Sequence, residues 1–282
     1  MFRIITDSAS DISQEEAKQL GIQVLPIKTI FGDEEYLDGV TIQHEEYWNR
    51  MIETGEIPST SQIAPFEYEE CFEEVAKAGE EALVITISAK LSGCYQSAHI
   101  GAEDYADRIY IVDSQNVTVG ERSLVEYAIR LREEGRSAAE TAEELDRVKG
   151  RIHLIALLDT LEYLKKGGRI SAAAAIAGAV LSIKPVIAIE GGQVAVLGKA
   201  RGSKQGNNML REQIDKNGPI DFTMPHCLAY TGLSDVLLTK YLSDHEDLYK
   251  PYEEEMPVST VGSAIGTHIG PGAICFAFFK KE

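Results

Sequence analysis

The first half of the chain alternates short apolar runs with longer amphipathic segments, and this alternation limits the fold more than any other feature. The runs at 2–7, 82–88 and 108–114 have the length and β-branched content of buried strands, and 21–31 is predicted as one further strand. The segments between them carry apolar residues at helical spacing, with Pro65 in the first turn of one helix. Parallel strands need a helical crossover. We therefore expect an α/β domain with a doubly wound parallel sheet.

The pattern changes after about residue 150. The stretch at 185–198 is typical of a β-hairpin that turns at Gly191 and Gly192. Three further apolar runs are typical of strands: 226–231, 256–260 and 273–279. Helical segments lie among them, and this mixture predicts an α+β domain. We divide the chain into an N-terminal domain at 1–152 and a C-terminal domain at 153–282.

Charge and cysteine usage exclude several classes of protein. The formal net charge of −18 argues against a nucleic-acid-binding protein, which needs a basic face. The four cysteines have neither disulfide-framework nor metal-site spacing and are expected to be reduced thiols. We expect no signal peptide, because the chain runs directly into a strand, and no segment long and apolar enough to span a bilayer. These features predict a cytoplasmic location.

Polar side chains follow several of the predicted strands, where a doubly wound sheet binds its ligands. Ser92 and Gly93 stand at the predicted start of a helix, whose free N–H groups and dipole favour an anion. Thr60 and Ser61 lie on a predicted loop that folds over the same edge. These hydroxyls are compatible with a carboxylate site and equally with simple helix capping. Three other residues that follow strands are expected to cap the next helix: Ser8, Asp11 and Asp113.

A glycine-rich stretch near the end of the sequence, "GTHIGPGA", contains His268. A buried core histidine seldom needs so many glycines around it. Glycine lets the backbone approach a ligand closely and adopt positive φ. We therefore interpret the stretch as a bend that directs the imidazole toward a ligand.

Other chemistries find less support in the sequence. Ser92 and His268 would supply a nucleophile and a base, so a small-molecule hydrolase or acyltransferase is the alternative function. However, "LSGCY" lacks the G-x-S-x-G pattern of a nucleophile elbow. The stretch "GKARGSK" lacks the spacing of a phosphate-binding loop. The six histidines show no metal-ligand spacing, so we expect no metal site.

The segment "ISAAAAIAGAVLSI" consists almost wholly of small and aliphatic residues and has almost no polar face. It is either a helix packed tightly on a sheet or one wall of a tunnel for a long, thin ligand. An acyl chain suits such a tunnel, because each buried methylene contributes roughly 0.8 kcal/mol. The carboxylate of such a ligand would have to be satisfied at the tunnel mouth.

Several motifs occur in an order that identifies a family: "TDSASDI", "STSQ", "ISAKLSGCYQSA", "IVDS", "LEYLKKGGRIS", "SIKPVI" and "GTHIGPGA". The chain resembles the DegV family of fatty-acid-binding proteins over nearly its whole length. The resemblance implies two domains with a long-chain fatty acid buried between them. It implies that Thr60 and Ser92 hold the carboxylate, with Ser61 and Gly93 beside them and His268 near the head group.

The resemblance further implies that Arg169 and Arg201 lie near the pocket mouth, for phosphoryl transfer or contact with a kinase. Surface charge near a helix start is the alternative explanation for both arginines. Two residues depart from the family pattern and affect the expected shape of the mouth: Ile63, where proline is common, and Cys94, where threonine is common. Cys94 would otherwise be a reactive thiol at a helix start.

The implied function is that of a carrier, without catalytic activity of its own. The protein would bury the tail of a long-chain fatty acid and present the carboxylate to a separate, dihydroxyacetone-kinase-like fatty acid kinase. The product would be an acyl phosphate for phospholipid synthesis. We expect no cofactor, no nucleic acid, and a transient contact with a membrane. The helix predicted at 171–183 is the candidate lid through which the fatty acid enters.

Overall fold

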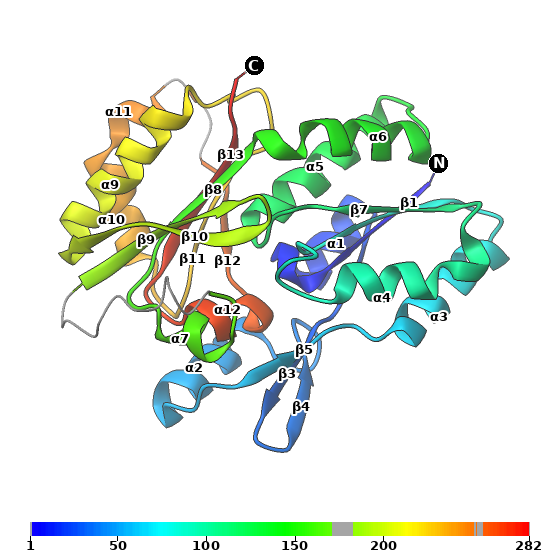
Figure 1. Cartoon of the computed structure of the whole chain (residues 1–282), viewed down its shortest axis with the longest axis horizontal. Coiled ribbons are helices and arrows are strands. Elements are labelled where there is room, and N and C mark those ends of the chain that lie inside the picture. Colours follow the sequence, from blue (N-terminus) through cyan, green and yellow to red (C-terminus); the bar gives the residue numbers. More distant parts are fainter. Residues whose placement is uncertain (1, 171–182, 251, 253–255, 282) are drawn as a thin grey trace.

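The computed structural model describes residues 2–170, 183–250, 252 and 256–281, and its strands form three sheets. Figure 1 shows a parallel sheet in one lobe, a larger mixed sheet in the other, and a small antiparallel sheet below the junction.

The first sheet has the strand order β2 (Gln23–Leu25), β1 (Arg3–Asp7), β6 (Ala82–Thr86) and β7 (Ile109–Asp113), all parallel. The helices α3 (Pro65–Lys77) and α4 (Cys94–Gly101) share an apolar cluster with one of its faces. The other face packs against α1 (Gln14–Leu20), α5 (Val119–Glu133) and α6 (Ala138–Val148). The predicted doubly wound sheet is confirmed.

The second sheet has the order β10 (Gln193–Arg201), β9 (Ile183–Glu190), β8 (Ile152–Leu157), β13 (Ile274–Phe279), β11 (Cys227–Tyr230) and β12 (Val258–Thr260). All its neighbouring strands are antiparallel except β11 and β12. One face packs against α9 (Gly202–Asn217), α10 (Val236–Asp244) and α11 (Glu246–Tyr249). The predicted hairpin is present, and both turn glycines, Gly191 and Gly192, have positive φ.

The third sheet was not predicted from the sequence. It consists of β4 (Glu34–Leu37), β3 (Lys28–Phe31) and β5 (Ser59–Ser61), and α2 (His44–Thr54) lies beside it. The stretch expected to be one strand at 21–31 divides into β2 and β3, which belong to different sheets. Pro26 stands in the break and has no N–H to donate to a ladder. The expected loop that carries Thr60 and Ser61 is the edge strand β5.

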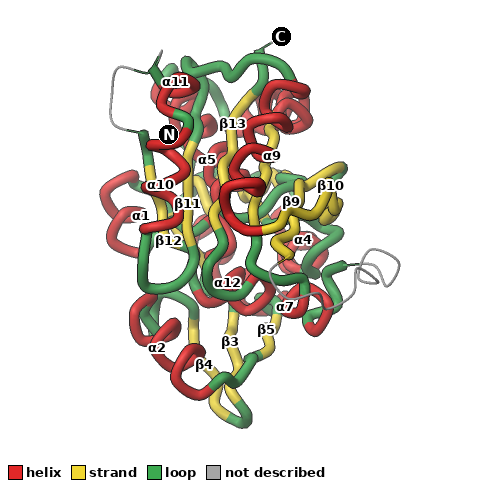
Figure 2. Tube along the Cα trace, turned by 90° about the vertical axis from the view of Figure 1, so that its left-hand side faces the viewer, coloured by secondary structure: helices red, strands yellow, loops and turns green. Residues whose placement is uncertain are grey.

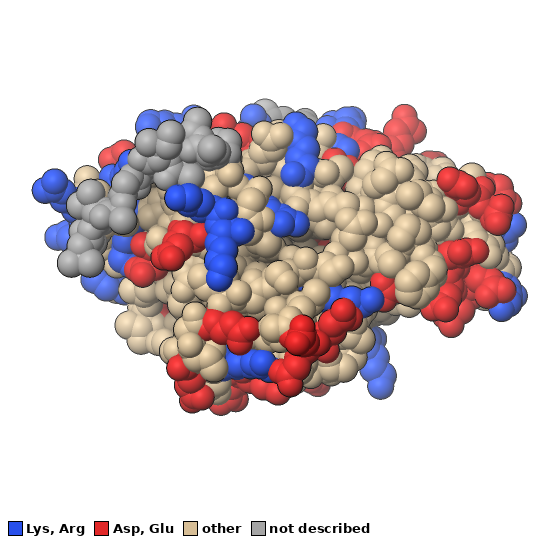
Figure 3. Space-filling view, turned by 60° about the horizontal axis from the view of Figure 1, so that its bottom comes forward, with Lys and Arg blue, Asp and Glu red and all other residues tan. Residues whose placement is uncertain are grey.

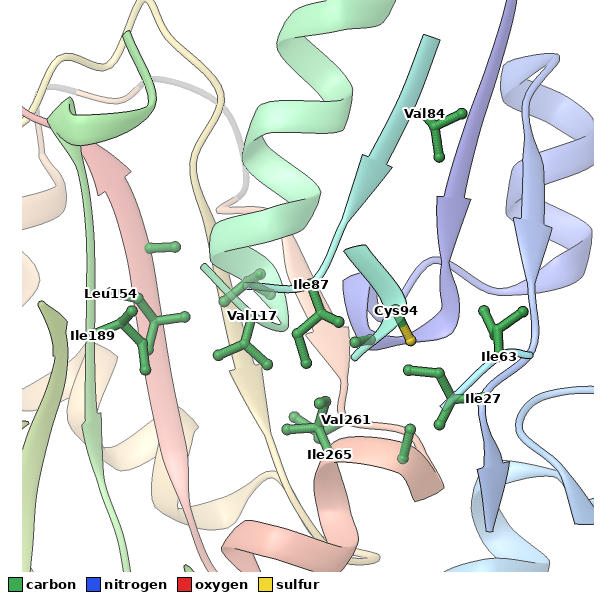
Figure 4. Close-up of a cluster of buried hydrophobic side chains, with 14 of the residues drawn as sticks. Ile27, Ile63, Val84, Ile87, Cys94, Val117, Leu154, Ile189, Val261 and Ile265 are labelled. Carbon is green, nitrogen blue, oxygen red and sulfur yellow. The ribbon is translucent and has the colours of Figure 1, made fainter. Parts of the chain in front are cut away.

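The inner face of the second sheet lies opposite the first sheet, and one apolar cluster contains side chains from both. Figure 4 shows this relationship: Leu154 and Ile189 project from the second sheet toward Val117, Ile87 and the strands of the first lobe. Strand β8 begins at Ile152, close to the expected boundary at residues 152 and 153. That boundary stays a prediction.

The remaining helices α7 (Glu162–Lys166) and α12 (Ser263–Ile269) lie where the three sheets meet. Figure 2 shows both of them between the second sheet and β3 and β5. The helix predicted at 171–183 falls at residues 171–182 outside the described residues, and Ile183 begins β9.

Candidate functional site

A long apolar cavity lies between the two large sheets. Its lining comes from both halves of the sequence: Ile27, Thr60, Gln62, Ile87, Leu91, Ser92, Val117, Thr118, Leu154, Ala156, Leu158, Leu164, Arg169, Ile187, Ile189, Val194, Ala264, Ile265, His268, Ile269 and Cys275. The space between these side chains, including its opening, amounts to about 790 Å³. Most of this wall is aliphatic and suits an apolar ligand.

Four of the residues singled out in the sequence share this cavity. Thr60 comes from β5, Ser92 precedes α4, Arg169 follows α7, and His268 lies in the last turn of α12. A second hollow, which includes the exposed residues Ser59 and Lys166, shares Thr60, Arg169 and His268 with the cavity. These three side chains therefore separate the apolar interior from the protein surface, and we call the group Thr60, Ser92, Arg169 and His268 the polar mouth.

The side chains of Thr60 and His268 are hydrogen-bonded, with 2.9 Å between Oγ1 and Nε2. Two arrangements satisfy this contact. When Nε2 carries the proton, it donates to Oγ1, and the hydroxyl of Thr60 is free to donate in turn. When Nδ1 carries the proton, Thr60 donates to Nε2 and offers only lone pairs to the cavity. A carboxylate in the mouth selects the first arrangement, because a carboxylate needs donors.

Burial and the nearby Arg169 guanidinium lower the pKa of His268 to about 4. The imidazole is therefore neutral at neutral pH in the protein without ligand. It can orient Thr60, but it does not act as a cationic partner for an anion in that state. The positive charge of the polar mouth belongs to Arg169. A neutral imidazole suits an orienting role for His268 better than that of a charged partner.

The bend that the sequence predicted follows His268 and does not carry it, because Gly270 and Gly272 have positive φ in the turn between α12 and β13. His268 lies in a helix, and Gly266 packs against α2: an added Cβ there would lie 2.8 Å from the Trp48 ring. A Cβ on Gly270, which has φ of 70°, would lie 2.2 Å from the ring of Tyr163. The glycines therefore allow close packing around α12. One further glycine belongs to this environment, because a Cβ on Gly167 would lie 2.2 Å from Nδ1 of His268.

Ser92 and Arg169 are linked through the loop before α4. Arg169 donates from Nε to the carbonyl of Leu91 at 3.1 Å and from Nη1 to the carbonyl of Gly167 at 2.6 Å. The Oγ of Ser92 accepts from the backbone N–H of Cys94 at 3.4 Å. The α4 start, the Ser92 hydroxyl and a guanidinium thus lie in one place, and this combination is favourable for an anion.

Three predicted site residues do not line the cavity. Successive side chains of a strand point to opposite faces, so Ser61 faces away while Thr60 and its second neighbour Gln62 line the wall. Gly93 lies beneath Gln62, and an added Cβ would be 1.9 Å from Oε1 of that amide. Arg201 is exposed at the end of β10 and lines neither of the two hollows described above. Gln62 was not predicted, although strand alternation from Thr60 would have indicated it.

Buried carboxyl groups hold α12 in place, and the sequence did not predict this role. Asp38 accepts from the N–H and the hydroxyl of Ser263, both at 2.8 Å, at the first residue of the helix. Asp11 accepts from the N–H of Gly262 at 2.8 Å and from the hydroxyl of Thr118. Asp11 therefore contacts the residues that begin α12 and α5, and it does not cap the next helix in sequence as expected.

The hydrogen bonds at the mouth are not those of a nucleophile and its base. His268 is bonded to Thr60, whereas the Ser92 hydroxyl contacts the Cys94 thiol at 3.3 Å. Among the residues that the structure describes, the buried Nδ1 of His268 has no hydrogen-bond partner, so none of them orients the ring as a third group orients a catalytic base. Burial raises the pKa of the Cys94 thiol to about 12, which excludes the reactive thiolate considered from the sequence. Cys94 and Ile63 lie side by side in the apolar cluster (Figure 4).

Metal sites and membrane-spanning helices are both absent from the described residues. No group of three or more His, Cys, Asp or Glu side chains there is placed to hold a metal ion. Within the same ranges, no helix has the length and apolar character needed to cross a membrane.

Fold and site together define a two-lobed α/β protein with an apolar cavity closed by a polar mouth. The family model for DegV, described as "Uncharacterised protein, DegV family", matches residues 1–281. The chain belongs to the DegV family. A DegV domain-containing protein of Caldanaerobacter subterraneus is 35% identical over 282 residues, which cover 99% of this chain and 98% of the relative.

Solved structures of similar proteins carry the same fold. A DegV family protein from Thermus thermophilus, described for its fatty acid binding, is 29% identical with a TM-score of 0.87, and each chain is covered completely. A stearic acid-binding protein from Eubacterium ventriosum is 26% identical with a TM-score of 0.85, over 99% of both chains. DegV from Bacillus subtilis, a fatty acid binding protein, is 25% identical with a TM-score of 0.85, again over 99% of both chains.

Proposed function

We propose that this protein binds a long-chain fatty acid, buries its acyl chain in the cavity between the sheets and holds its carboxylate at the polar mouth. One observation carries the proposal: a mainly aliphatic cavity has the hydroxyls of Thr60 and Ser92, the imidazole of His268 and the guanidinium of Arg169 at its mouth. The fatty-acid-binding relatives with the same fold support it. Each methylene taken from water contributes roughly 0.8 kcal/mol, so the tail supplies most of the affinity.

Each residue of the polar mouth contributes a different interaction with the carboxylate. Thr60 donates its hydroxyl proton while His268 donates to Thr60 from Nε2, so the imidazole fixes the direction of the donated proton. Ser92 offers a second hydroxyl at the start of α4. Arg169 supplies the charge, and its guanidinium is already oriented by the carbonyls of Leu91 and Gly167. Ser61 and Gly93 do not contact the ligand. Ser61 belongs to the strand β5 that carries Thr60, and Gly93 stands between Ser92 and the first residue of α4.

The finer part of the proposal is that the bound carboxylate is presented to a separate ATP-dependent kinase, which converts it to an acyl phosphate. The polar mouth faces a surface hollow, and a partner can reach the carboxylate there while the tail stays buried. Arg169 would stabilise the charge that develops on the transferred phosphoryl group. Arg201 lies on the exposed end of β10, where it would contact the kinase and not the phosphoryl group.

The surface around the mouth bears on how such a partner would dock. Figure 3, which views the molecule from the side of α7, α12 and the small sheet, shows acidic side chains concentrated at one end and along the lower margin, and most of the lysine and arginine side chains in the other half. A kinase that docks here would meet both signs of charge, and its association would be sensitive to salt.

A brief contact with a membrane would supply the fatty acid, and we expect the protein to work in the cytoplasm.

The proposal is tested by organic extraction of the purified protein and mass spectrometry of the extract. We expect one fatty acid per chain, recovered unchanged. A protein that stays empty after incubation with a mixture of fatty acids would contradict the binding function. Turnover of ester substrates by the protein alone would instead favour a hydrolase, and Ser92→Ala would then abolish the turnover.

The kinase step needs its own experiment. The loaded protein is mixed with a candidate fatty acid kinase and ATP, and acyl phosphate is trapped with hydroxylamine. We expect Arg169→Gln to reduce product formation at saturating kinase, and Arg201→Gln to raise the kinase concentration needed for half-maximal rate. The two variants could instead change the rate at saturating kinase and the half-maximal kinase concentration to the same extent. That result would contradict separate roles for Arg169 in phosphoryl transfer and Arg201 in kinase contact.

A further inference from the structure

The part of the cavity wall that β8, β9 and β10 form contains one small residue among large ones. The described residues of these strands that line the cavity are leucine, isoleucine and valine, except for Ala156, the residue before the last of β8. Its neighbour across the ladder on β13, Cys275, is also short and lines the same wall. Two short side chains therefore face the cavity next to each other, near the carboxyl end of β8.

The direction of β8 distinguishes the end of the cavity at the polar mouth from the interior end. Beyond the carboxyl end of β8, Leu158 leads through α7 to Arg169, so that end adjoins the polar mouth. Leu154 lies four residues back along the chain, about 13 Å away at the rise of a β-strand. The sequence of positions from mouth to interior is therefore Leu158, Ala156 and Leu154.

The interior end is closed by large side chains and by the hairpin. Leu154 lies beside Ile189, and Val117 faces them from the other lobe (Figure 4). Val194 pairs with Ile189 on the adjacent strand and also lines the cavity. Beyond them, the hydroxyl of Ser88 donates to the carbonyl of Gly192 at 2.8 Å and fixes the hairpin turn to the first lobe.

We propose that Ala156 and Leu154 determine the length of acyl chain that this protein accepts, with Ala156 giving passage at the midpoint and Leu154 forming the end wall. This inference rests on the proposed fatty-acid binding and assigns its chain-length specificity. A larger side chain at 156 blocks the passage and selects shorter acids. A smaller side chain at 154 opens the end wall and selects longer ones. Each methylene that no longer fits costs roughly fourfold in affinity.

The test is a competition in which the protein is incubated with an equimolar mixture of saturated fatty acids of graded length, and the bound acids are measured by mass spectrometry. The variants are Ala156→Leu, the milder Ala156→Val, and Leu154→Ala. The matched control is Ala195→Leu, which adds the same volume on β10. Ala195 pairs with Ala188, on the face that packs against α9 and away from the cavity.

We expect Ala156→Leu to move the bound mixture toward shorter chains by at least about tenfold in the ratio of short to long acids. Ala156→Val should move it in the same direction by less, Leu154→Ala in the opposite direction, and Ala195→Leu not at all. If Ala156→Leu does not fold, the profiles of Ala156→Val and Leu154→Ala test the length assignment. Identical profiles for wild type and all variants would overturn the length assignment alone. A wild-type protein that takes up no fatty acid would overturn both this inference and the proposed function.

Discussion

The Nε2 of His268 lies 2.9 Å from the Oγ1 of Thr60, although 208 positions separate the two residues in the sequence. This contact joins the edge strand of the small sheet to the last turn of α12. Because both side chains line the cavity and the surface hollow, the contact also forms part of the boundary between them. In the proposed function, a neutral imidazole in this position directs the proton of Thr60 toward the carboxylate.

Replacing Thr60 by valine keeps the shape of the side chain and removes its hydroxyl. We expect the affinity for a fatty acid to fall roughly tenfold, because the carboxylate loses one donor and Nε2 of His268 loses its partner. The measurement is displacement of a fluorescent fatty acid. Ser59→Ala, on the exposed face of the same strand, is the control and should bind as wild type does. Equal losses for both variants would mean that the effect comes from β5 as a whole.

Gly167 and Gly168 offer a second matched pair. Gly167 has no positive φ, but a Cβ there would meet Nδ1 of His268 at 2.2 Å. Gly168 has φ of 70° and nothing within 4 Å of an added Cβ. We expect Gly167→Ala to displace the imidazole and weaken fatty-acid binding with little loss of stability. Gly168→Ala should cost about 1 kcal/mol of stability through backbone strain and leave binding almost unchanged. Calorimetry measures the stability of each variant, and ligand titration measures its affinity for a fatty acid. Weaker binding by Gly168→Ala and lower stability of Gly167→Ala would contradict this arrangement of the mouth.

The low pKa of His268 has a consequence for acid stability. Its pKa is about 4 in the folded protein and about 6.5 in the unfolded chain, so between these values the unfolded state binds more protons. The free energy of unfolding therefore decreases as the pH falls from about 6.5 toward 4. His268→Gln should show a shallower decrease in urea titrations across this range, and the exposed His99→Gln should follow the wild type. Parallel curves for wild type and His268→Gln would show that the imidazole titrates normally.

Local sequence signals predicted the elements of the fold that depend on neighbouring residues. The Gly191–Gly192 turn is such a case, because both positions need positive φ and the flanking strands are apolar. Ser137 and Glu140 carry a local signal of the same kind, because their spacing is that of a capping box and both side chains cap the start of α6. Pro26 is also a local signal, because proline cannot donate to a strand ladder. The prediction of one strand at 21–31 rested on the apolar character of the stretch and did not use this signal.

The parts that could not be predicted depend on contacts between distant segments. The glycines around His268 indicated freedom of the backbone, which Gly270 and Gly272 use, but only the positions of Trp48 and Tyr163 show that close packing also requires Gly266 and Gly270. The partners of Asp11, which are Thr118 and Gly262, stand 107 and 251 residues away. Resemblance to the family implied that Ser61 lies beside Thr60 in the site, and the loop expected there gave no reason to separate the two side chains, because alternation is a property of strands. Resemblance to the family placed Thr60, Ser92 and His268 together, which spacing alone did not.

The buried Asp11 gives a prediction of opposite sign to that of His268. Burial raises the pKa of its carboxyl group to about 8, whereas the ordinary value in an unfolded chain is 3.8. Between these values the folded state binds more protons, so the stabilising contribution is complete below about pH 4 and is lost as the pH rises through about 8. Asp11→Asn removes this titration. Asparagine also suits the left-handed conformation at this position, where φ is 54°, and its amide can still accept from Gly262 and bond to Thr118.

We therefore expect the free energy of unfolding of Asp11→Asn to depend less on pH than that of the wild type between about pH 5 and 8, with the variant relatively more stable at the upper end. Urea unfolding at several pH values measures this difference, and the exposed Asp235→Asn serves as the control. A variant that loses the same stability at every pH would show that Asp11 is ionised in the folded protein. In that case its hydrogen bonds to the starts of α5 and α12 are made by a carboxylate, and the anchoring of α12 would be strongest at high pH.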